Sequence, residues 1–317
     1  MLIFDQTTYL KSKFRNEEEL ESVVLANFEY LFGPDSIFLP KALIKTTQGS
    51  GTIPDGFAID LAKKKWYIVE AELLHHGVWA HIVPQVTKQL IASNNPESKT
   101  TIQELAVIEF EGNPIIQEKF EALGISHLHV RRELREILEG APTISIPIDE
   151  TSKDLTDWAI TLGFEVVIWE IEKFVHQDNP EQLIYSLPDD FAPSFNSRTN
   201  GIGRESSASR NHFPDTIRDL MDEGLIMQGD ELSMTYKKRG KKPQAFKAIV
   251  QENGFLNVLN QSIQSPSRAA VLCIQETGSQ RQTANGWTSW SNKKGQKLSD
   301  LREILFERRI GNQDARE

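Results

Sequence analysis

Three carboxylates in the first third of the chain could act together on one chemical group. Asp55 precedes an apolar run, and Glu70 and Glu72 follow the short buried run from Trp66 to Val69. Because successive side chains of a strand alternate between its faces, Glu70 and Glu72 should project to the same side. Converging carboxylates repel one another unless a cation lies between them, and oxygen ligands suit magnesium or manganese. The pattern therefore predicts a site for Mg²⁺ or Mn²⁺.

The two runs that carry these acids should form a β-hairpin. Residues 56–61 tend toward apolar residues, and the lysines at 63–65 supply a charged turn before the aromatic and β-branched second run. A hairpin folded at the lysines brings Asp55 alongside Glu70 and Glu72. A solvated acidic edge on an ordinary hairpin is the alternative explanation of the same residues.

The hairpin resembles the core of the PD-(D/E)XK nuclease superfamily. The resemblance rests on Ile53-Pro54-Asp55 followed by Val69-Glu70-Ala71-Glu72, and it is best over residues 15–95. It implies that Asp55, Glu70 and the Ala71 carbonyl hold a divalent metal for phosphodiester hydrolysis. Glu72 would bind a second metal or accept a proton from the attacking water. It stands where the family most often has lysine, which leaves open an inactive protein built on the same fold.

A helix should precede the hairpin. Asn16 is a suitable N-cap for a helix with three glutamates in its first turn, and Gly33-Pro34 should end the element. In the resembled family, a glutamate on the first helix often joins the metal site. Glu17 is therefore the candidate and Glu21 the substitute.

A second helix should follow the hairpin over residues 83–93, because Pro84 is tolerated only in a first turn or at a kink. On a continuous helix, His81, Gln85 and Lys88 would share one polar stripe beside the acids. The resemblance implies that a polar residue of this helix touches the reacting water or the phosphate, and Gln85 is the best match. Lys88 could supply the positive charge that position 72 lacks. His81 could belong to the functional site or be a structural histidine.

The segments that follow alternate between strand and helix patterns. Strands are predicted at 105–110, 127–130, 143–148 and 164–170, and helices at 114–123 and 152–162. This alternation of strands and helices indicates an α/β fold with a mixed central sheet flanked by helices. Such a fold is the restriction-endonuclease-like core that the resemblance implies. We assign residues 1–185 to this nuclease-like domain.

Composition limits the class of protein. The 317 residues, 39% of them hydrophobic, can bury the cores of two domains. No apolar run approaches the ~18 residues that a membrane span needs, and the N-terminus lacks a basic segment followed by an apolar one. Cys273 is the only cysteine, which excludes an internal disulfide and a multi-cysteine zinc site and fits a reducing cytoplasm. A cytoplasmic protein without a membrane partner is expected.

Charge and composition separate the two ends of the chain. Residues 211–317 hold 16 Lys+Arg and 13 Asp+Glu, which leaves 19 and 32 in residues 1–210. The densest basic cluster, Lys237-Lys238-Arg239-Gly240-Lys241-Lys242, could contact DNA phosphates or form a solvated turn. Residues 186–210 are rich in Ser, Asn, Gly, Pro and Arg, which indicates a flexible linker.

Residues 211–317 are interpreted as a smaller α+β domain. A helix at 214–223, a turn and strand at 224–232, and a hairpin of 246–250 with 255–258 precede two motifs. The motifs are Ser265-Pro266-Ser267-Arg268-Ala269-Ala270 and Asn285-Gly286-Trp287-Thr288-Ser289-Trp290. Together these segments resemble the restriction-enzyme-adenine-methylase-associated (RAMA) domain over 213–302. That family is linked to recognition of DNA, including modified DNA.

The two motifs supply candidate DNA-binding residues. Ser265, Ser267 and Arg268 open a helix, where unpaired N–H groups favour a phosphate, although simple helix capping is the alternative. Asn285 should begin a turn that feeds a strand. Trp287 and Trp290 could stack on a base, or both could pack in the core.

The combined hypothesis is a metal-dependent DNA endonuclease of the restriction or defence type, with a C-terminal domain that reads sequence or base modification. Cutting both strands of double-stranded DNA requires two active sites, so we expect a homodimer on DNA. One alternative is a catalytically inactive protein that binds modified DNA. The other is a zinc hydrolase that uses Glu72, His75 or His76, and His81. The zinc enzyme is disfavoured because Glu-x-x-His continues into Gly77 instead of along one helical face.

Overall fold

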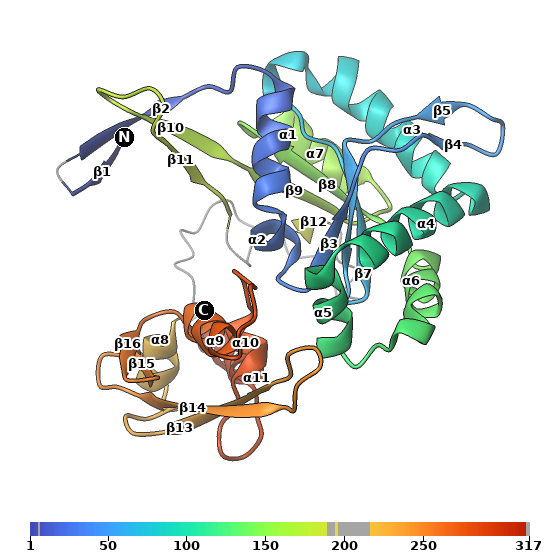
Figure 1. Ribbon diagram of the computed structural model, residues 1–317. Helices are drawn as coiled ribbons and strands as arrows, with labels where there is room; N and C mark the ends of the chain where they lie inside the picture. The colour runs from blue at the N-terminus through green and yellow to red at the C-terminus, as the bar shows by residue number, and fades with distance from the viewer. Residues whose placement is uncertain (6, 189–193, 196–215, 315–317) are drawn as a thin grey trace. The chain divides into compact units, whose positions relative to one another are not determined.

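A computed structural model describes residues 1–5, 7–188, 194–195 and 216–314, and the structural statements below concern these residues. The chain divides into two compact units, Met1–Arg204 and Glu205–Glu317, which are described separately (Figure 1). Among the described residues, no helix combines the length and apolar character required to cross a bilayer.

The first unit is built on a six-stranded mixed sheet of order β12-β9-β8-β7-β6-β3. The strands are β3 (Ser36–Leu39), β6 (Gly56–Asp60), β7 (Lys65–Val69), β8 (Thr143–Ile148), β9 (Val166–Glu170) and β12 (Ser194–Phe195). β3, β6 and β7 are antiparallel neighbours, whereas β7, β8 and β9 run parallel. The predicted hairpin is confirmed, with Gly56 opposite Val69 at its open end.

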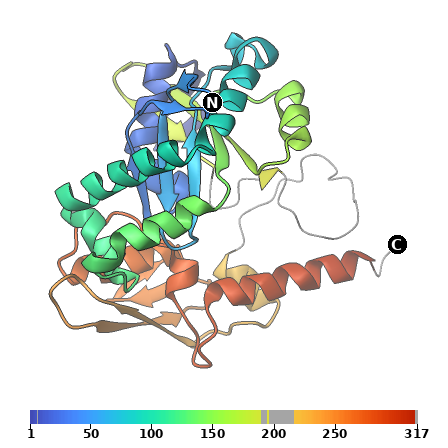
Figure 2. The same ribbon diagram turned by 90° about the vertical axis from the view of Figure 1, so that its right-hand side faces the viewer.

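Helices cover both faces of this sheet. On one face, α1 (Glu17–Ala26) and α2 (Phe28–Phe32) bury a core that includes Val69 and Ala71. The core on the other face includes Phe57 and Ile68 and is covered by α3 (Val83–Ser93), α4 (Pro96–Gly112), α5 (Pro114–Ala122), α6 (Val130–Glu139) and α7 (Lys153–Thr161). In Figure 2, α4 and α6 lie in front of the strands. Since side chains alternate along a strand, Glu70 points away from Val69 and Ala71 and toward α3, whose Gln85 and Gln89 bind it.

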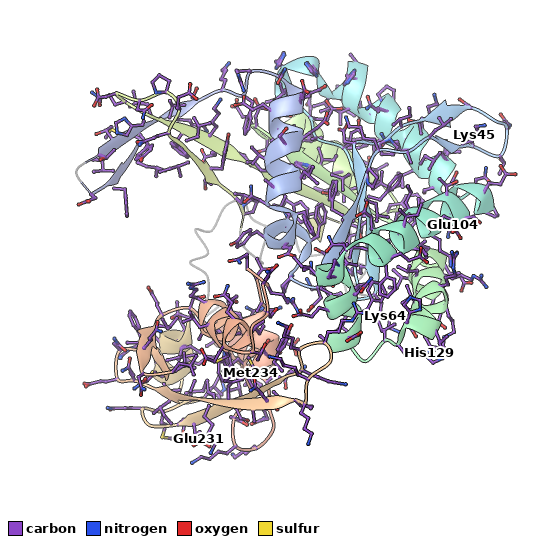
Figure 3. All side chains as sticks on the ribbon, viewed as in Figure 1. Lys45, Lys64, Glu104, His129, Glu231 and Met234 are labelled. Carbon is purple, nitrogen blue, oxygen red and sulfur yellow. The ribbon has the colours of Figure 1, made fainter. Side chains whose placement is uncertain are left out.

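Two smaller sheets complete the first unit. One contains β1 (Leu2–Phe4), β2 (Thr7–Ser12), β10 (Glu172–His176) and β11 (Leu183–Ser186), and the other pairs β4 (Ile44–Lys45) with β5 (Gly51–Thr52). The connections include two 3-10 turns, η1 (Leu74–His76) and η3 (His127–His129), and a π-helical turn, η2 (Val78–Ile82). Charged side chains such as Lys64 and Glu104 lie at the surface, where Lys64 Nζ is 3.2 Å from Glu133 Oε2 (Figure 3).

Two strand predictions in this unit are wrong. Residues 105–110 lie inside α4, and residues 127–130 form η3 and the start of α6. The apolar run at 105–110 is typical of a strand locally, yet Ile102, Ala106 and Phe110 are buried four residues apart on one helical face. The other predicted strands and helices of residues 114–170 agree with the structure to within two residues.

The range predicted to be a linker, 186–210, also differs where it is described. Residues 194–195 form β12, which pairs with β9 and so extends the central sheet. Most of the remaining range, including its arginines, lies outside the described residues.

The second unit combines a four-stranded antiparallel sheet with helices. The strands are β13 (Glu231–Tyr236), β14 (Gln244–Val250), β15 (Leu256–Val258) and β16 (Gln261–Ile263), and the helices are α8 (Ile217–Asp222), α9 (Pro266–Glu276), α10 (Gly286–Ser289) and α11 (Leu298–Asp314). They share one core, in which Leu232, Cys273 and Trp290 are fully buried. The predicted β14–β15 hairpin is confirmed, and Gly254 turns it with a φ of 82°.

One predicted element of this unit is wrong. Residues 285–290 do not feed a strand, because Asn285 Oδ1 accepts hydrogen bonds from Trp287 N and Thr288 N at 3.1 and 3.3 Å and thereby caps α10. Only glycine fits at 286, since a Cβ there would lie 2.1 Å from Pro266 C. The turn therefore opens a short helix that packs against the start of α9.

Candidate functional site

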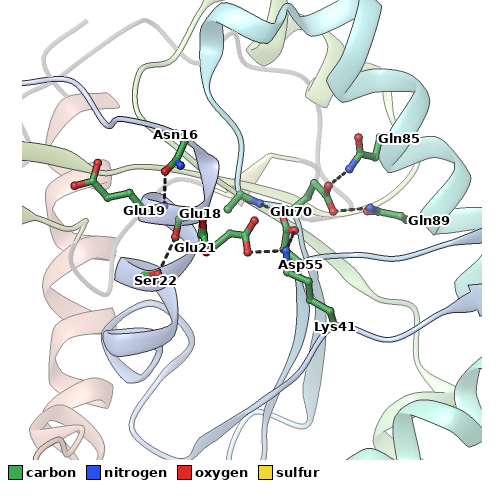
Figure 4. A network of polar contacts seen from close by, with 11 residues as sticks. Asn16, Glu18, Glu19, Glu21, Ser22, Lys41, Asp55, Glu70, Gln85 and Gln89 are labelled. Carbon is green, nitrogen blue, oxygen red and sulfur yellow. Dashed lines mark hydrogen bonds and ion pairs between the residues drawn. The ribbon is translucent and has the colours of Figure 1, made fainter.

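Asp55 and Glu70 meet at the open end of the β6–β7 hairpin. Asp55 directly precedes β6 and Glu70 directly follows β7, so the pairing of Gly56 with Val69 sets the two acids side by side. Asp55 Oδ2 accepts a hydrogen bond from Ala71 N at 2.9 Å, which fixes the aspartate against the second strand. Figure 4 shows the Glu70 side chain next to Asp55. The structure thus brings together two of the three acids predicted to converge.

Two glutamines of α3 hold the Glu70 carboxylate. Gln85 Nε2 donates to Glu70 Oε1, and Gln89 Nε2 donates to Glu70 Oε2 (Figure 4). Glu70 is only 2% exposed. Burial, followed by the nearby charge of Asp55, raises the pKa of Glu70 to about 8. A cation close to this pair would favour the ionised carboxylate.

Lys41 supplies the positive charge beside Asp55. Its Nζ lies 2.9 Å from Asp55 Oδ1 and 2.6 Å from Glu21 Oε2. Burial opposes the charge of Lys41, yet hydrogen bonds to Glu21 and Asp55 raise its pKa above the usual value. For Asp55, burial is the largest effect and raises the pKa, against the lowering effect of Lys41. The sequence did not reveal Lys41, because it lies in an irregular segment with no periodicity to relate it to Asp55.

A cavity of about 470 Å³ opens beside this group. Lys41, Asp55 and Ala71 line it together with Glu21 and Leu25 of α1. A polar ligand can therefore reach Asp55 even though Glu70 is buried.

Glu72 lies in a second polar group. It is 1% exposed, and within the described part of the chain neither of its carboxylate oxygens has a hydrogen-bond partner. His81 Nε2 is 3.6 Å from Glu72 Oε1, and His76 Nδ1 is 3.8 Å from Glu72 Oε2. Glu17 Oε1 is 2.5 Å from the same His76 nitrogen. Of the two glutamates considered on the first helix, Glu17 therefore lies with Glu72, whereas Glu21 pairs with Lys41.

Glu72 is still within electrostatic range of the first group. Its pKa is raised to about 9, and burial is the largest cause. Glu17 makes the next largest contribution, and the negative charges of Glu70 and Asp55 raise the pKa further by smaller amounts. The three predicted acids thus influence one another, but they have different immediate partners.

Lys88, the other predicted residue of α3, has different surroundings. Its side chain is exposed and lines a cavity with Thr46 and Ser50 of the β4–β5 hairpin. In the part of the chain that the structure describes, no hydrogen bond or ion pair joins Lys88 to the three acids. Gln89 was not predicted from the sequence, although its spacing would have allowed it. It follows Gln85 by four residues and therefore lies on the same helical face.

In the second unit, the serines predicted to contact DNA make hydrogen bonds within the fold. Ser265 Oγ accepts from Arg268 N at 3.3 Å and caps α9, and Ser267 Oγ accepts from Gly286 N at 3.1 Å. Helix capping, one of the two interpretations, is therefore present. Contact of Ser265, Ser267 and Arg268 with phosphate, and of Asn285 with DNA, stays a prediction.

Both tryptophans pack in the core of the second unit. Trp287 is 7% exposed and Trp290 is 0% exposed. Trp290 Nε1 donates to Pro266 O at 3.1 Å, and the Arg302 guanidinium lies 4.8 Å from the centre of the Trp287 ring. Core packing therefore replaces base stacking as the role of these two rings.

The basic cluster lies in the connection between β13 and β14. Lys238 Nζ donates to Gly278 O, and Lys241 Nζ donates to Thr277 O at 3.1 Å. These carbonyls follow the last turn of α9, where positive charge stabilises a helix. Lys237 and Arg239 are exposed, and their contact with DNA stays a prediction.

Comparison with known families supports the interpretation of the second unit. Residues 197–310 match the RAMA family, Restriction Enzyme Adenine Methylase Associated. The range predicted from the sequence, 213–302, falls inside this match. A comparison with curated proteins gives no match. The chain thus contains a RAMA domain, which suggests an association with restriction and modification.

Proposed function

We propose that the protein is a metal-dependent DNA endonuclease of the restriction or defence type. Residues 1–185 would hydrolyse phosphodiester bonds, and the RAMA domain would read DNA sequence or base modification. The observation that carries the proposal is the pair of acids Asp55 and Glu70 at the adjoining ends of β6 and β7, with Lys41 beside them. The mixed sheet, antiparallel from β3 to β7 and parallel from β7 to β9, supports the PD-(D/E)XK resemblance.

The two acids fit a bound Mg²⁺ or Mn²⁺. Burial and neighbouring negative charge raise the pKa of both carboxyls, and a cation between them would relieve that repulsion. Asp55 and Glu70 are the proposed ligands, and the Ala71 carbonyl joins them on the resemblance alone. The cation would supply Lewis acidity, which activates water and neutralises charge on the phosphate oxygens.

The side chains around the acids would position the reacting groups. Gln85 and Gln89 bind both oxygens of Glu70, so its carboxylate has one orientation. Lys41 would place its ammonium next to a phosphate oxygen that enters the cavity beside Asp55. For Glu72 the resemblance allows two roles, ligand of a second metal or acceptor of the water proton.

Cleavage of supercoiled plasmid by the wild type and by two aspartate variants tests the proposal. Wild-type protein with Mg²⁺ should nick or linearise methylated or unmethylated plasmid. Asp55→Asn should slow cleavage at least ~100-fold, because several kcal/mol of charge stabilisation are lost. Asp60→Asn is the matched control: Asp60 is buried at the other end of β6, and asparagine can keep the hydrogen bonds that Asp60 Oδ1 accepts from Ala62 N and Lys63 N. If the wild type cleaves neither plasmid, the enzyme proposal fails; if Asp55→Asn cleaves normally, the site is misassigned.

Lys41 and Lys88 provide a second matched comparison. Lys41→Met should lower the cleavage rate, because it removes the cation that contacts Asp55. Lys88→Met should leave the rate near that of the wild type, since Lys88 is exposed beside the β4–β5 hairpin. The reverse result would assign the missing positive charge to the lysine of α3.

A second candidate function is a protein that binds modified DNA without cutting it. Glu72 occupies the position where the resembled family most often has lysine, and residues 1–210 contain 32 acidic and 19 basic residues, which disfavours close approach of DNA to a catalytic surface. Preferential binding of a methylated over an unmethylated duplex, with no cleavage in Mg²⁺ or Mn²⁺, would select this function.

A further inference from the structure

Four side chains from separate segments place imidazole and carboxylate groups around one point. Glu17 begins α1, Glu72 follows β7, His76 ends η1 and His81 lies in η2. One ligand atom from each of the four lies within 4.8 Å of the others. Since α1 is distant in sequence from the other three, tertiary folding creates this group.

Polar atoms at the centre of the group lack the partners that burial normally requires. Both carboxylate oxygens of Glu72 have no hydrogen-bond partner among the described residues, and Glu17 Oε1 and His76 Nδ1 contact only each other, at 2.5 Å. Glu72 itself is 1% exposed. An unsatisfied buried polar group costs about 1–3 kcal/mol, and more when it is charged. A bound cation would satisfy these atoms together.

The backbone between the two histidines departs from a regular helix. Gly77 has a φ of 85°, and Gly77 O accepts from His81 N at 3.1 Å and from Ile82 N at 3.5 Å, the second bond being that of a π turn. On a regular helix, residues five apart would point about 140° away from each other. Here the His76 and His81 rings lie 5.4 Å apart and both approach Glu72. π turns recur at functional sites.

We propose that Glu17, Glu72, His76 and His81 form a binding site for a transition-metal dication, with Zn²⁺ preferred over Mg²⁺. Two imidazoles and two carboxylates match the ligands of tetrahedral zinc, whereas Mg²⁺ takes oxygen ligands. Asp55 and Glu70 are not members of this group, and their donors are all oxygens. The inference does not rest on the proposed nuclease activity.

The number of ligands also indicates what the metal would do. Catalytic zinc sites keep one position for water, whereas structural sites are closed by four protein ligands. Four protein ligands would fix the start of α1 to the η1–η2 segment. The site is therefore structural, in contrast to the zinc hydrolase considered from the sequence. With zinc bound, Glu72 would take neither of the two catalytic roles that the resemblance allows it, and Asp55 and Glu70 would hold the catalytic metal alone.

Metal binding by the full chain tests this inference directly. The protein is stripped with a chelator, Zn²⁺ is added in excess Mg²⁺, and metal content is measured by mass spectrometry after desalting. Wild type should retain one zinc per chain, and His76→Ala and His81→Ala should lose it. His75→Ala is the matched control, because His75 is an exposed neighbour outside the group.

Two further readouts separate this site from the proposed nuclease site and from misfolding. Zn²⁺ should raise the melting temperature of wild type and of His75→Ala but not of His76→Ala. If circular dichroism shows that His81→Ala does not fold, His81→Gln is used in its place. Asp55→Asn should keep its zinc whether or not it cleaves DNA. Wild type without zinc, or undiminished zinc in folded His76 and His81 variants, would overturn the inference.

Discussion

Glu70 and Glu72 are two residues apart on one extended segment, and both are buried, yet they have different neighbours. Gln89 donates to Glu70 and lowers its pKa, whereas Glu17 raises the pKa of Glu72. Burial dominates in both cases, so the pKa values are about 8 and about 9. A carboxyl in such surroundings binds a proton near neutral pH unless a cation replaces it.

These raised pKa values predict that the metal-free protein loses stability as pH rises. A carboxyl whose folded-state pKa exceeds its unfolded value binds more protons when folded, so the free energy of unfolding falls with increasing pH between the two. The window runs from the ordinary value of 4.5 to about 9. The expected slope is about 1.4 kcal/mol per pH unit for each extra proton bound. Urea unfolding in EDTA at pH 5, 7 and 9 measures it.

Glu72→Gln is the control for this prediction. The glutamine cannot titrate, so its protein should lose less stability between pH 5 and pH 9 than the wild type does. A wild-type free energy of unfolding that stays constant over this range would contradict the raised pKa values.

At the scale of elements, regular segments made the site predictable and irregular ones did not. The period of two along 66–72 and the position of Pro84 located β7 and α3, and with them Glu70 and Gln85. Residues 105–110 have the same local character as a buried strand, and only the four-residue spacing of buried residues over all of α4 distinguishes a helix. Lys41 belongs to no periodic segment, so only tertiary structure relates it to Asp55.

The basic connection between β13 and β14 allows a prediction that separates folding from DNA binding. Lys238→Ala removes a charged hydrogen bond to the carbonyl end of α9 and should lower stability by about 1 kcal/mol. Lys237→Ala should leave the melting temperature unchanged but weaken DNA binding, with the slope of log affinity against log salt smaller by about 1. Thermal unfolding and fluorescence anisotropy at several salt concentrations measure the two effects. An unchanged salt slope in Lys237→Ala would remove this lysine from the DNA interface.

At the scale of the whole molecule, each chain carries one Asp55–Glu70 pair, and charge is divided unequally along the chain. Residues 211–317 contain 16 basic and 13 acidic residues, against 19 and 32 in residues 1–210. Under the proposed function, the RAMA-matched part would be the one suited to attract DNA, while the acidic part would depend on divalent cations to approach it. A double-strand cut would then require two chains.

This requirement predicts a change of assembly on DNA. Asp55→Asn, which should bind without cutting, is mixed with a duplex that the wild type cleaves, and molar mass is measured by light scattering after size exclusion. Two chains per duplex are expected. One chain per duplex, together with nicked but never linear plasmid from the wild type, would show that the protein acts as a monomer on one strand.

Two facing segments hold the two polar groups of the site in step. Gln85 lies at Glu70 while His81 lies near Glu72, so the chain from η2 into α3 pairs with the chain from Glu70 to Glu72. A substitution alters one of these pairs, but a one-residue insertion or deletion in either segment shifts both. Natural variation here should therefore change side chains while conserving the number of residues.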